Sequence, residues 1–244
     1  MDVLFRSRPE ILAGGMARDD TTVQFYMRVA ALASSEDVVL DLGAGRGVLF
    51  DGPEDYKRSI ARLKGRVKRL AGCDVDPAVL KNTNLDDAQV VDPAAPLPYA
   101  DETFDLIYSD WVIEHVDNPA RFVFELRRVL KPGGWFCART PNKWGYVALG
   151  ARLVPSAFEK KVLHRLQPDR LDHDVFPKWY RLNTLGQIRR AFPESDWINA
   201  SFPTNATPAY YGQSAILFHA IDWYQKLTPA AMNTMLLVFM QKRG

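Results

Sequence analysis

Residues 38–47 read VVLDLGAGRG. Four apolar residues around Asp41 predict a buried strand. Gly43, Gly45 and Gly47 follow it and predict a tight turn, because glycine lets the backbone take unusual angles and come close to a ligand. A ligand site is therefore expected where this strand ends, with the Asp41 carboxylate beside it.

Strand and helix patterns alternate around this turn, which predicts an α/β fold with a doubly wound, mostly parallel sheet and helices on both faces. An amphipathic helix is predicted at residues 21–33, capped by Asp19 or Asp20. The KPGG sequence at 131–134 is expected to stop a helix. Further strands are predicted at 67–75, 88–92, 103–109, 135–140, 196–202 and 232–242, and further helices at 54–65, 76–85, 118–130, 183–192 and 214–227.

Composition indicates a single globular domain over residues 1–244, since 47% of the residues are hydrophobic and 25% are charged. A net charge of +2 gives no basic surface for nucleic acid, so no nucleic-acid partner is expected. The strongest basic cluster is interpreted as a solvated helix face, with attraction to a phosphorylated acceptor or an anionic lipid surface as the alternative. It consists of Lys57, Arg58, Arg62, Lys64, Arg66, Lys68 and Arg69.

Location is inferred from the cysteines and from the apolar runs. Cys73 and Cys137 both lie in predicted strands, which is typical of buried thiols in a reducing cytoplasm. The first residues do not resemble a secretory signal, and the late apolar run at 235–240 is far shorter than the ~20 residues that span a bilayer. A cytoplasmic protein without a membrane span is expected, with peripheral membrane contact as the only membrane alternative. The sequence does not indicate its oligomeric state.

Two ligand classes use a strand followed by a glycine turn: dinucleotides and S-adenosylmethionine. The dinucleotide pattern G-x-G-x-x-G needs a third glycine where Val48 stands. Asp41 would also repel a pyrophosphate, whereas it could accept hydrogen bonds from the ammonium group of S-adenosylmethionine. The residues therefore favour S-adenosylmethionine.

With these motifs the sequence resembles the class I S-adenosylmethionine-dependent methyltransferases over residues 38–142. VLDLGAGRG resembles their first motif, GCDVDPAVL the end of their second strand, and RVLKPGGWFCARTPN the approach to their fifth strand. The likeness is strongest to the small-molecule branch, methyltransferase type 11, which includes quinone-biosynthesis C-methyltransferases. It implies a Rossmann-like sheet of seven strands with an antiparallel last strand, and S-adenosylmethionine as the cofactor with S-adenosylhomocysteine as the product.

The resemblance also implies roles for individual residues. Asp74 would bind the ribose hydroxyls and Asp92 the adenine amino group, and Asp74 is preferred to Asp76 because it ends the apolar strand. Tyr26 would close over the cofactor from an N-terminal helical lid at residues 1–36. The full set expected to bind the cofactor is Tyr26, Asp41, Gly43, Ala44, Gly45, Asp74, Val75, Asp92, Pro93 and Ser109. The segment after Gly47 is longer than usual, so its helix is expected to start late, near residue 53.

Methyl transfer requires alignment of donor and acceptor and, for a hydroxyl or an acidic carbon, a base; no metal is required. His115, after the fourth strand, and His173, between two aspartates, are the candidate catalytic bases. His164 is expected on the surface, and His219 is expected to be packed. Residues 143–183, an insertion, are expected to form part of the acceptor pocket.

The expected activity is an S-adenosylmethionine-dependent methyltransferase acting on a small molecule such as a saccharide, a lipid precursor or a quinone-like ring. Residues 109–112 read SDWV rather than the Asn/Asp-Pro-Pro-Tyr of amide N-methyltransferases, so oxygen or carbon is preferred as the acceptor atom. The alternatives are a nicotinamide-dependent oxidoreductase on the same fold and a non-catalytic partner subunit.

Overall fold

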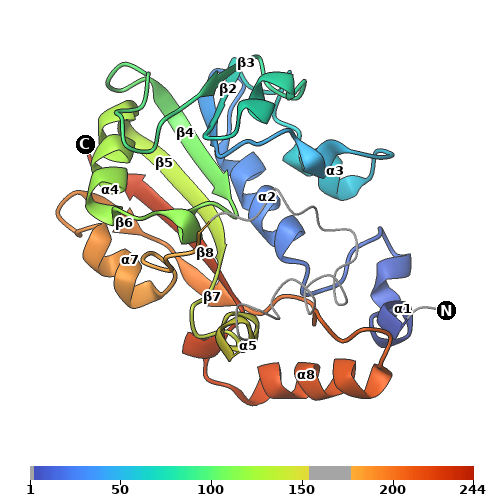
Figure 1. Ribbon diagram of the computed structural model, residues 1–244. Helices are drawn as coiled ribbons and strands as arrows, with labels where there is room; N and C mark the ends of the chain where they lie inside the picture. Colours follow the sequence, from blue (N-terminus) through green and yellow to red (C-terminus); the bar gives the residue numbers. More distant parts are fainter. Residues whose placement is uncertain (1–2, 154–176) are drawn as a thin grey trace.

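The computed structural model describes residues 3–153 and 177–244, and this part of the chain contains one sheet of eight strands in the order β3-β2-β1-β4-β5-β8-β6, with β7 also paired to β8 (Figure 1). Strands β1 to β5 pair in parallel, and β8 runs antiparallel to its neighbours. This is the predicted mixed α/β sheet. The strands are β1 (Val38–Leu42), β2 (Arg69–Asp74), β3 (Asp87–Val90), β4 (Phe104–Asp110), β5 (Leu130–Pro141), β6 (Trp197–Asn199), β7 (Phe202–Thr204) and β8 (Met235–Lys242).

Strands β6 and β7 occupy a single place in the sheet. Asn199 pairs with Met240 and Phe202 pairs with Leu237, so the register along β8 continues unchanged across the gap between them. They are one edge strand that is interrupted for two residues. The sheet therefore has the seven strand positions that were predicted, with the last strand antiparallel.

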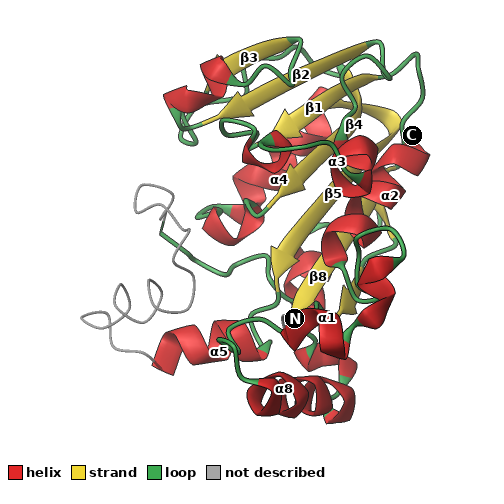
Figure 2. Ribbon diagram, turned by 90° about the vertical axis from the view of Figure 1, so that its right-hand side faces the viewer, coloured by secondary structure: helices red, strands yellow, loops and turns green. Residues whose placement is uncertain are grey.

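Helices cover both faces of the sheet, as Figure 2 shows. On β1, Leu40 packs into a core with α4 and α7, while its neighbour Val39 packs into a second core with α2 and α3. This alternation is the two-residue period of a strand that is buried on both sides. The helices are α1 (Val3–Ser7), α2 (Thr21–Leu32), α3 (Tyr56–Ala61), α4 (Pro119–Val129), α5 (Tyr146–Leu153), α7 (Leu185–Ala191) and α8 (Ala215–Leu227), with 3₁₀ turns η1 (Pro9–Leu12), η2 (Val48–Phe50), η3 (Pro77–Lys81), η4 (Ile113–His115) and η6 (Ala230–Met232).

Helix α4 ends at Val129, just before KPGG, but the strand expected to begin at 135 already includes KPGG. Strand β5 begins at Leu130, directly after α4, and runs through KPGG as a bulge. Leu130 pairs with Phe104 and Trp135 with Leu106, which leaves the extra residues outside the ladder. A Cβ on Gly134 would lie 2.9 Å from the carbonyl oxygen of Asp105, so glycine permits this close approach of the two strands.

The segment between β1 and β2 departs from a continuous helix, as expected from its length. The glycine turn leads into η2, and α3 begins only at Tyr56, with Asp55 accepting a hydrogen bond from the Arg58 N–H.

Most residues of the basic cluster form ion pairs or hydrogen bonds with nearby groups. Ion pairs join Lys57 to Asp20, Arg58 to Asp55, Arg62 to Glu54 and Arg69 to Asp87. These pairs support the interpretation of the cluster as a structural surface.

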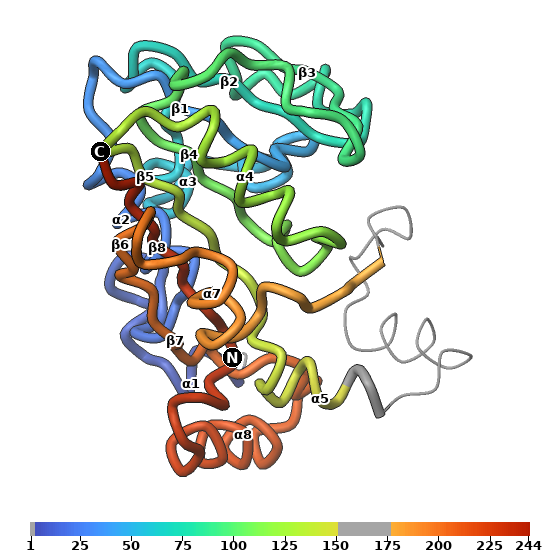
Figure 3. The backbone as a smooth tube through the Cα atoms, turned by 90° about the vertical axis from the view of Figure 1, so that its left-hand side faces the viewer, coloured from blue at the N-terminus to red at the C-terminus, as the bar shows by residue number. Residues whose placement is uncertain are grey.

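Helices α1, α5 and α8 gather at one end of the molecule (Figure 3). Helix α1 contacts α8, and the Tyr146 ring of α5 meets the Tyr224 ring of α8 edge to face at 6.4 Å. Within residues 3–153 and 177–244, no helix combines the length and apolarity needed to cross a membrane.

Candidate functional site

The glycine turn after β1 is fastened to the end of β2. The Gly43 N–H donates to the carbonyl oxygen of Cys73 at 2.7 Å, and the Gly45 N–H donates to Asp74 Oδ2 at 2.8 Å. Gly43 has φ +83°, and a Cβ there would lie 2.2 Å from Cγ2 of Val112. Asn82 Nδ2 also holds the turn in place by donating to the carbonyl oxygens of Ala44 and Gly45 at 3.2 Å. Glycine is thus required at 43 for both its backbone angles and its lack of a side chain.

Asp41 lies beside this turn, and its pKa is strongly raised. Its carboxylate accepts a hydrogen bond from the Tyr108 hydroxyl at 2.9 Å. Burial raises the pKa of Asp41 to about 7, the Tyr108 hydroxyl opposes the change, and nearby Asp110 and Asp74 contribute to it. A cation placed beside Asp41 would relieve this cost. The arrangement is suited to an ammonium group rather than to a phosphate.

Two more carboxylates follow at the ends of the next strands. Asp74 ends β2, and its Oδ1 accepts the Asp76 N–H at 2.8 Å. Asp76 instead caps η3 by accepting the Ala78 N–H, so these two acids have separate roles. Asp92 follows β3, is exposed, and accepts the Ala94 N–H at 2.7 Å. Asp41, Asp74 and Asp92 therefore follow one another across adjacent strands at one edge of the sheet.

The remaining residues expected to bind the cofactor differ in accessibility. Val75 and Pro93 are exposed beside Asp74 and Asp92. Ser109 is fully buried, and its Oγ makes no hydrogen bond to any residue in the described ranges. Tyr26 is also buried, and its hydroxyl donates to Asp110 Oδ2 at 3.2 Å. Tyr26 thus contacts the strand end through Asp110 in this structure.

Sequence reasoning missed a buried ion pair beside these residues. Arg139 of β5 donates to both carboxylate oxygens of Asp110 on β4, at 2.7 and 2.6 Å. The same guanidinium donates to the Thr22 hydroxyl at 2.6 Å, which ties the start of α2 to the strand ends. The signal was available, because Asp110 ends the apolar strand β4 and Arg139 lies near the end of β5, where a buried charge needs a partner.

A second carboxylate that sequence reasoning missed is Glu114, in the turn after β4. It is only 2% exposed, and it accepts a hydrogen bond from the Thr140 hydroxyl at 2.9 Å. Burial raises its pKa to about 7. Its carbonyl oxygen accepts the N–H groups of Trp179 and Tyr180 at 2.8 and 3.1 Å. Glu114 therefore joins η4 to the segment that follows residue 176.

The candidate histidines fall in different places. His115 Nδ1 lies 2.8 Å from the carbonyl oxygen of Pro177, which can only accept, so Nδ1 carries a proton. His164 and His173 lie outside the described residues. His219 is exposed on α8, so the expectation that it is packed was wrong; its neighbour Phe218 is the buried residue.

Cys73 and Cys137 are buried, free thiols in β2 and β5, as predicted. Burial raises the pKa of Cys73 to about 12, so it remains a thiol near neutral pH. These residues contribute to packing beneath the site.

The sequence model of a family described as "Methyltransferase domain", methyltransferase type 11, matches residues 40–138. A "Probable S-adenosylmethionine-dependent methyltransferase" of Mycolicibacterium smegmatis is 34% identical over 121 residues, covering 48% of this chain and 43% of that protein. A ubiquinone biosynthesis O-methyltransferase of Parvibaculum lavamentivorans is 30% identical over 134 residues, covering 52% of this chain and 49% of that protein. The chain thus matches about half the length of these curated relatives or less.

Among solved structures, the YcgJ protein of Bacillus subtilis has the same fold, with a TM-score of 0.53 at 16% identity, covering 92% of this chain and 99% of that one. The strand order, the glycine turn with its three acids, the family match and the relatives agree. Residues 40–138 therefore match a methyltransferase domain, and over this part the chain is similar to S-adenosylmethionine-dependent methyltransferases.

Proposed function

We propose that this protein transfers the methyl group of S-adenosylmethionine to an oxygen or a carbon of a small molecule, with the donor held where β1, β2 and β3 end. The observation that carries the donor site is the partly buried Asp41 carboxylate beside the glycine turn, where burial and the nearby Asp110 and Asp74 raise its pKa to about 7 and a cation would lower it again. When bound, S-adenosylmethionine supplies a methyl group on a sulfonium, which an aligned nucleophile displaces.

The residues present fit this cofactor. Asp41 would accept hydrogen bonds from its ammonium group. Asp74 already accepts one N–H on each carboxylate oxygen, and each oxygen has a further lone pair for a ribose hydroxyl. Asp92 would accept from the adenine amino group. Asp110 lies nearby but is engaged by Arg139, so it would not compete with Asp41 for the ammonium group.

His115 is the proposed general base on the acceptor side. Its Nδ1 contact with the carbonyl oxygen of Pro177 fixes the ring, and in the neutral form Nε2 would be the atom that accepts the proton. His173 remains the second candidate. The lid at residues 1–36 and the insertion at residues 143–183 are proposed to complete the acceptor pocket. Trp179 and Tyr180, which belong to that insertion, contact η4 next to His115 and support this proposal.

The acceptor is proposed to be a quinone-like ring, a saccharide or a lipid precursor. The ubiquinone biosynthesis O-methyltransferases among the relatives support a ring hydroxyl, and SDWV in place of the amide-specific motif supports oxygen or carbon. No observation favours the oxidoreductase or the non-catalytic alternative.

Calorimetry with S-adenosylhomocysteine, followed by transfer assays with labelled S-adenosylmethionine, tests this function. The panel would contain hydroxylated aromatic rings, saccharides and amides. Transfer to a hydroxyl or a ring carbon is expected. Absence of S-adenosylhomocysteine binding, or transfer confined to amide nitrogen, would overturn the proposal.

His115→Asn should lower kcat about a hundredfold without changing S-adenosylhomocysteine affinity. The control is His219→Asn, at an exposed histidine far along the chain, which should change neither quantity.

A further inference from the structure

Trp111, the first residue after β4, has a backbone conformation that its side chain disfavours. Its φ is +61°, in the left-handed region that strains a bulky residue and that glycine or asparagine adopts more readily. The ring is nevertheless 48% exposed. A strained residue persists only where its surroundings fix it, and such residues gather at functional sites, so the conformation of Trp111 points to a role.

Contacts on both sides fix this conformation. The Trp111 N–H donates to the carbonyl oxygen of Arg139 at 2.9 Å, directly after the last paired residues of β4 and β5. Val112, the next residue, packs so closely against Gly43 that no Cβ fits there. The backbone of Trp111 is therefore held between β5 and the glycine turn, and the direction of its indole ring is fixed with it.

A second strained aromatic residue contacts η4, the turn that follows Trp111. Tyr180 has φ +51°, and its N–H donates to the carbonyl oxygen of Glu114 at 3.1 Å. Its own carbonyl oxygen accepts from Gln187 Nε2 at 2.9 Å. Two strained aromatic residues are thus attached to the turn that carries His115, the proposed base.

The polar groups beside Trp111 are engaged with one another. The Arg139 guanidinium lies 5.7 Å from the centre of the indole ring, and it donates to both Asp110 oxygens and to the Thr22 hydroxyl. Asp110 also accepts from the Tyr26 hydroxyl. A saccharide needs several free donors and acceptors for its hydroxyls, because polar groups left unpaired on binding cost free energy. The surroundings of Trp111 suit a flat ring with few polar groups instead.

We propose that Trp111 determines acceptor specificity by stacking its indole on a planar aromatic ring, which selects that ring over a saccharide or an aliphatic chain. Offset stacking needs an exposed aromatic side chain that is held in place, and Trp111 has both properties. Val112 contacts the glycine turn and η4 carries the proposed base, so a ring on Trp111 would be next to both. This inference rests on the proposed function, because it names the substrate class of the same site.

Calorimetry with the protein loaded with S-adenosylhomocysteine tests the stacking. The probes are dihydroxynaphthalene, methyl glucoside and octanol, and the aromatic probe should bind at least about tenfold more tightly than the other two. Trp111→Phe keeps a flat ring and should retain binding of dihydroxynaphthalene within about threefold. Trp111→Leu keeps an apolar side chain without a ring and should weaken this binding at least about tenfold. Both variants should bind S-adenosylhomocysteine like the original chain.

The strain gives a second readout. Trp111→Asn places a residue that tolerates the left-handed region at this φ, so the urea midpoint should not fall although a large side chain is lost. Binding of dihydroxynaphthalene should nevertheless fall at least about tenfold. A tryptophan that only packs would show the opposite result, with a lower midpoint and unchanged binding.

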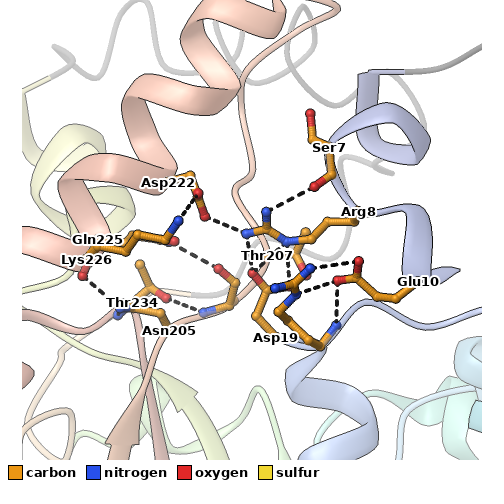
Figure 4. A network of polar contacts seen from close by, with 12 residues as sticks. Ser7, Arg8, Glu10, Asp19, Asn205, Thr207, Asp222, Gln225, Lys226 and Thr234 are labelled. Atoms are coloured by element: carbon orange, nitrogen blue, oxygen red, sulfur yellow. Dashed lines mark hydrogen bonds and ion pairs between the residues drawn. The ribbon is translucent and has the colours of Figure 1, made fainter.

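Trp223→Asn is the matched control, because it makes the same exchange at a tryptophan that is 64% exposed on α8. Asp222 is buried beside it, and its ion pairs with Arg8 and Lys226 fix the rotation of α8 (Figure 4). The helix should therefore stay in place in this variant. Binding of dihydroxynaphthalene should be unchanged.

The outcomes separate this inference from the proposed function. Three results would overturn the inference alone: no binding of dihydroxynaphthalene to the loaded protein, equal binding of the saccharide, or binding that Trp111→Leu and Trp111→Asn do not weaken. Each of them leaves S-adenosylhomocysteine binding intact. Failure of the original chain to bind S-adenosylhomocysteine would overturn both.

Discussion

The proposed donor end and the proposed acceptor end of the site are held by different kinds of contact. At the donor end, the contacts come from backbone N–H groups. Those of Gly43 and Gly45 donate hydrogen bonds to the end of β2, and the positive φ angles of these glycines shape the turn. At the acceptor end, His115 and Glu114 contact residues far along the chain, at Pro177 and Thr140. A turn built from backbone leaves a local pattern of glycines in the sequence, whereas a site built from distant side chains leaves no such pattern.

The same contrast predicts how each end responds to mutation. The donor end should fail through steric conflict and lost charge, because its parts have no alternative positions. The acceptor end should change in pH dependence and turnover while donor affinity is retained. Substitutions at the two ends can therefore separate them.

The largest effect is expected from Gly43→Ala. The added Cβ would lie 2.2 Å from Val112 and would require a positive φ, so a destabilisation of about 3 kcal/mol and loss of S-adenosylhomocysteine binding are expected. Gly65→Ala is the control, because Gly65 has φ +78° with nothing within 4 Å of a new Cβ. It should cost only about 1 kcal/mol and leave binding intact. Urea unfolding and calorimetry measure both, and equal costs for the two variants would contradict the steric explanation.

Asp41→Asn should have the next largest effect. It removes the charge that the ammonium group needs while keeping the shape, so donor affinity should fall about thirtyfold, or about 2 kcal/mol. The free protein should become no less stable, because a partly buried charge with a raised pKa is gone. Calorimetry and urea unfolding test the two parts, and unchanged donor affinity would remove the basis of the donor site.

The affinity for S-adenosylmethionine should depend on pH through Asp41. With a pKa of about 7 in the free protein, Asp41 is increasingly protonated at lower pH and cannot then accept from the ammonium group. Affinity should fall up to about tenfold for each unit below about pH 7, with a proton released on binding. Tyr108→Phe should move this transition to higher pH, because the hydroxyl lowers the pKa of Asp41. A flat profile from calorimetry would contradict the assignment.

The smallest effect is expected at the acceptor end, from Glu114→Gln. Burial raises the pKa of Glu114 from 4.5 to about 7, so the folded state binds more protons than the unfolded state in that window. The free energy of unfolding should therefore fall as pH rises from about 4.5 to 7. Replacing Glu114 by Gln should reduce this slope by on the order of 1 kcal/mol per pH unit. Donor affinity should not change. Urea unfolding across this range measures the slope, and a slope equal to that of the unmodified protein would show that Glu114 does not titrate there.

Most strands were predictable because each is an apolar run buried on both faces and bounded by turn residues. The places of Asp41, Asp74 and Asp92 followed from the ends of those runs. The KPGG bulge was not predictable, because its reason is the approach of the Asp105 carbonyl on a neighbouring strand. The rotation of α8 was not predictable either, since it is set by the ion pair between Asp222 and Arg8, more than two hundred residues apart.

The sequence by itself determined the α/β class, the glycine turn and the carboxylates that end the first strands, because these depend on local backbone freedom and on the two-residue period of a strand. The tertiary structure alone decided which buried charges pair, how Glu114 meets Thr140, and which face of α8 points outward. Those outcomes follow from satisfying polar groups that burial brings together, and no local pattern records which distant partner will do so.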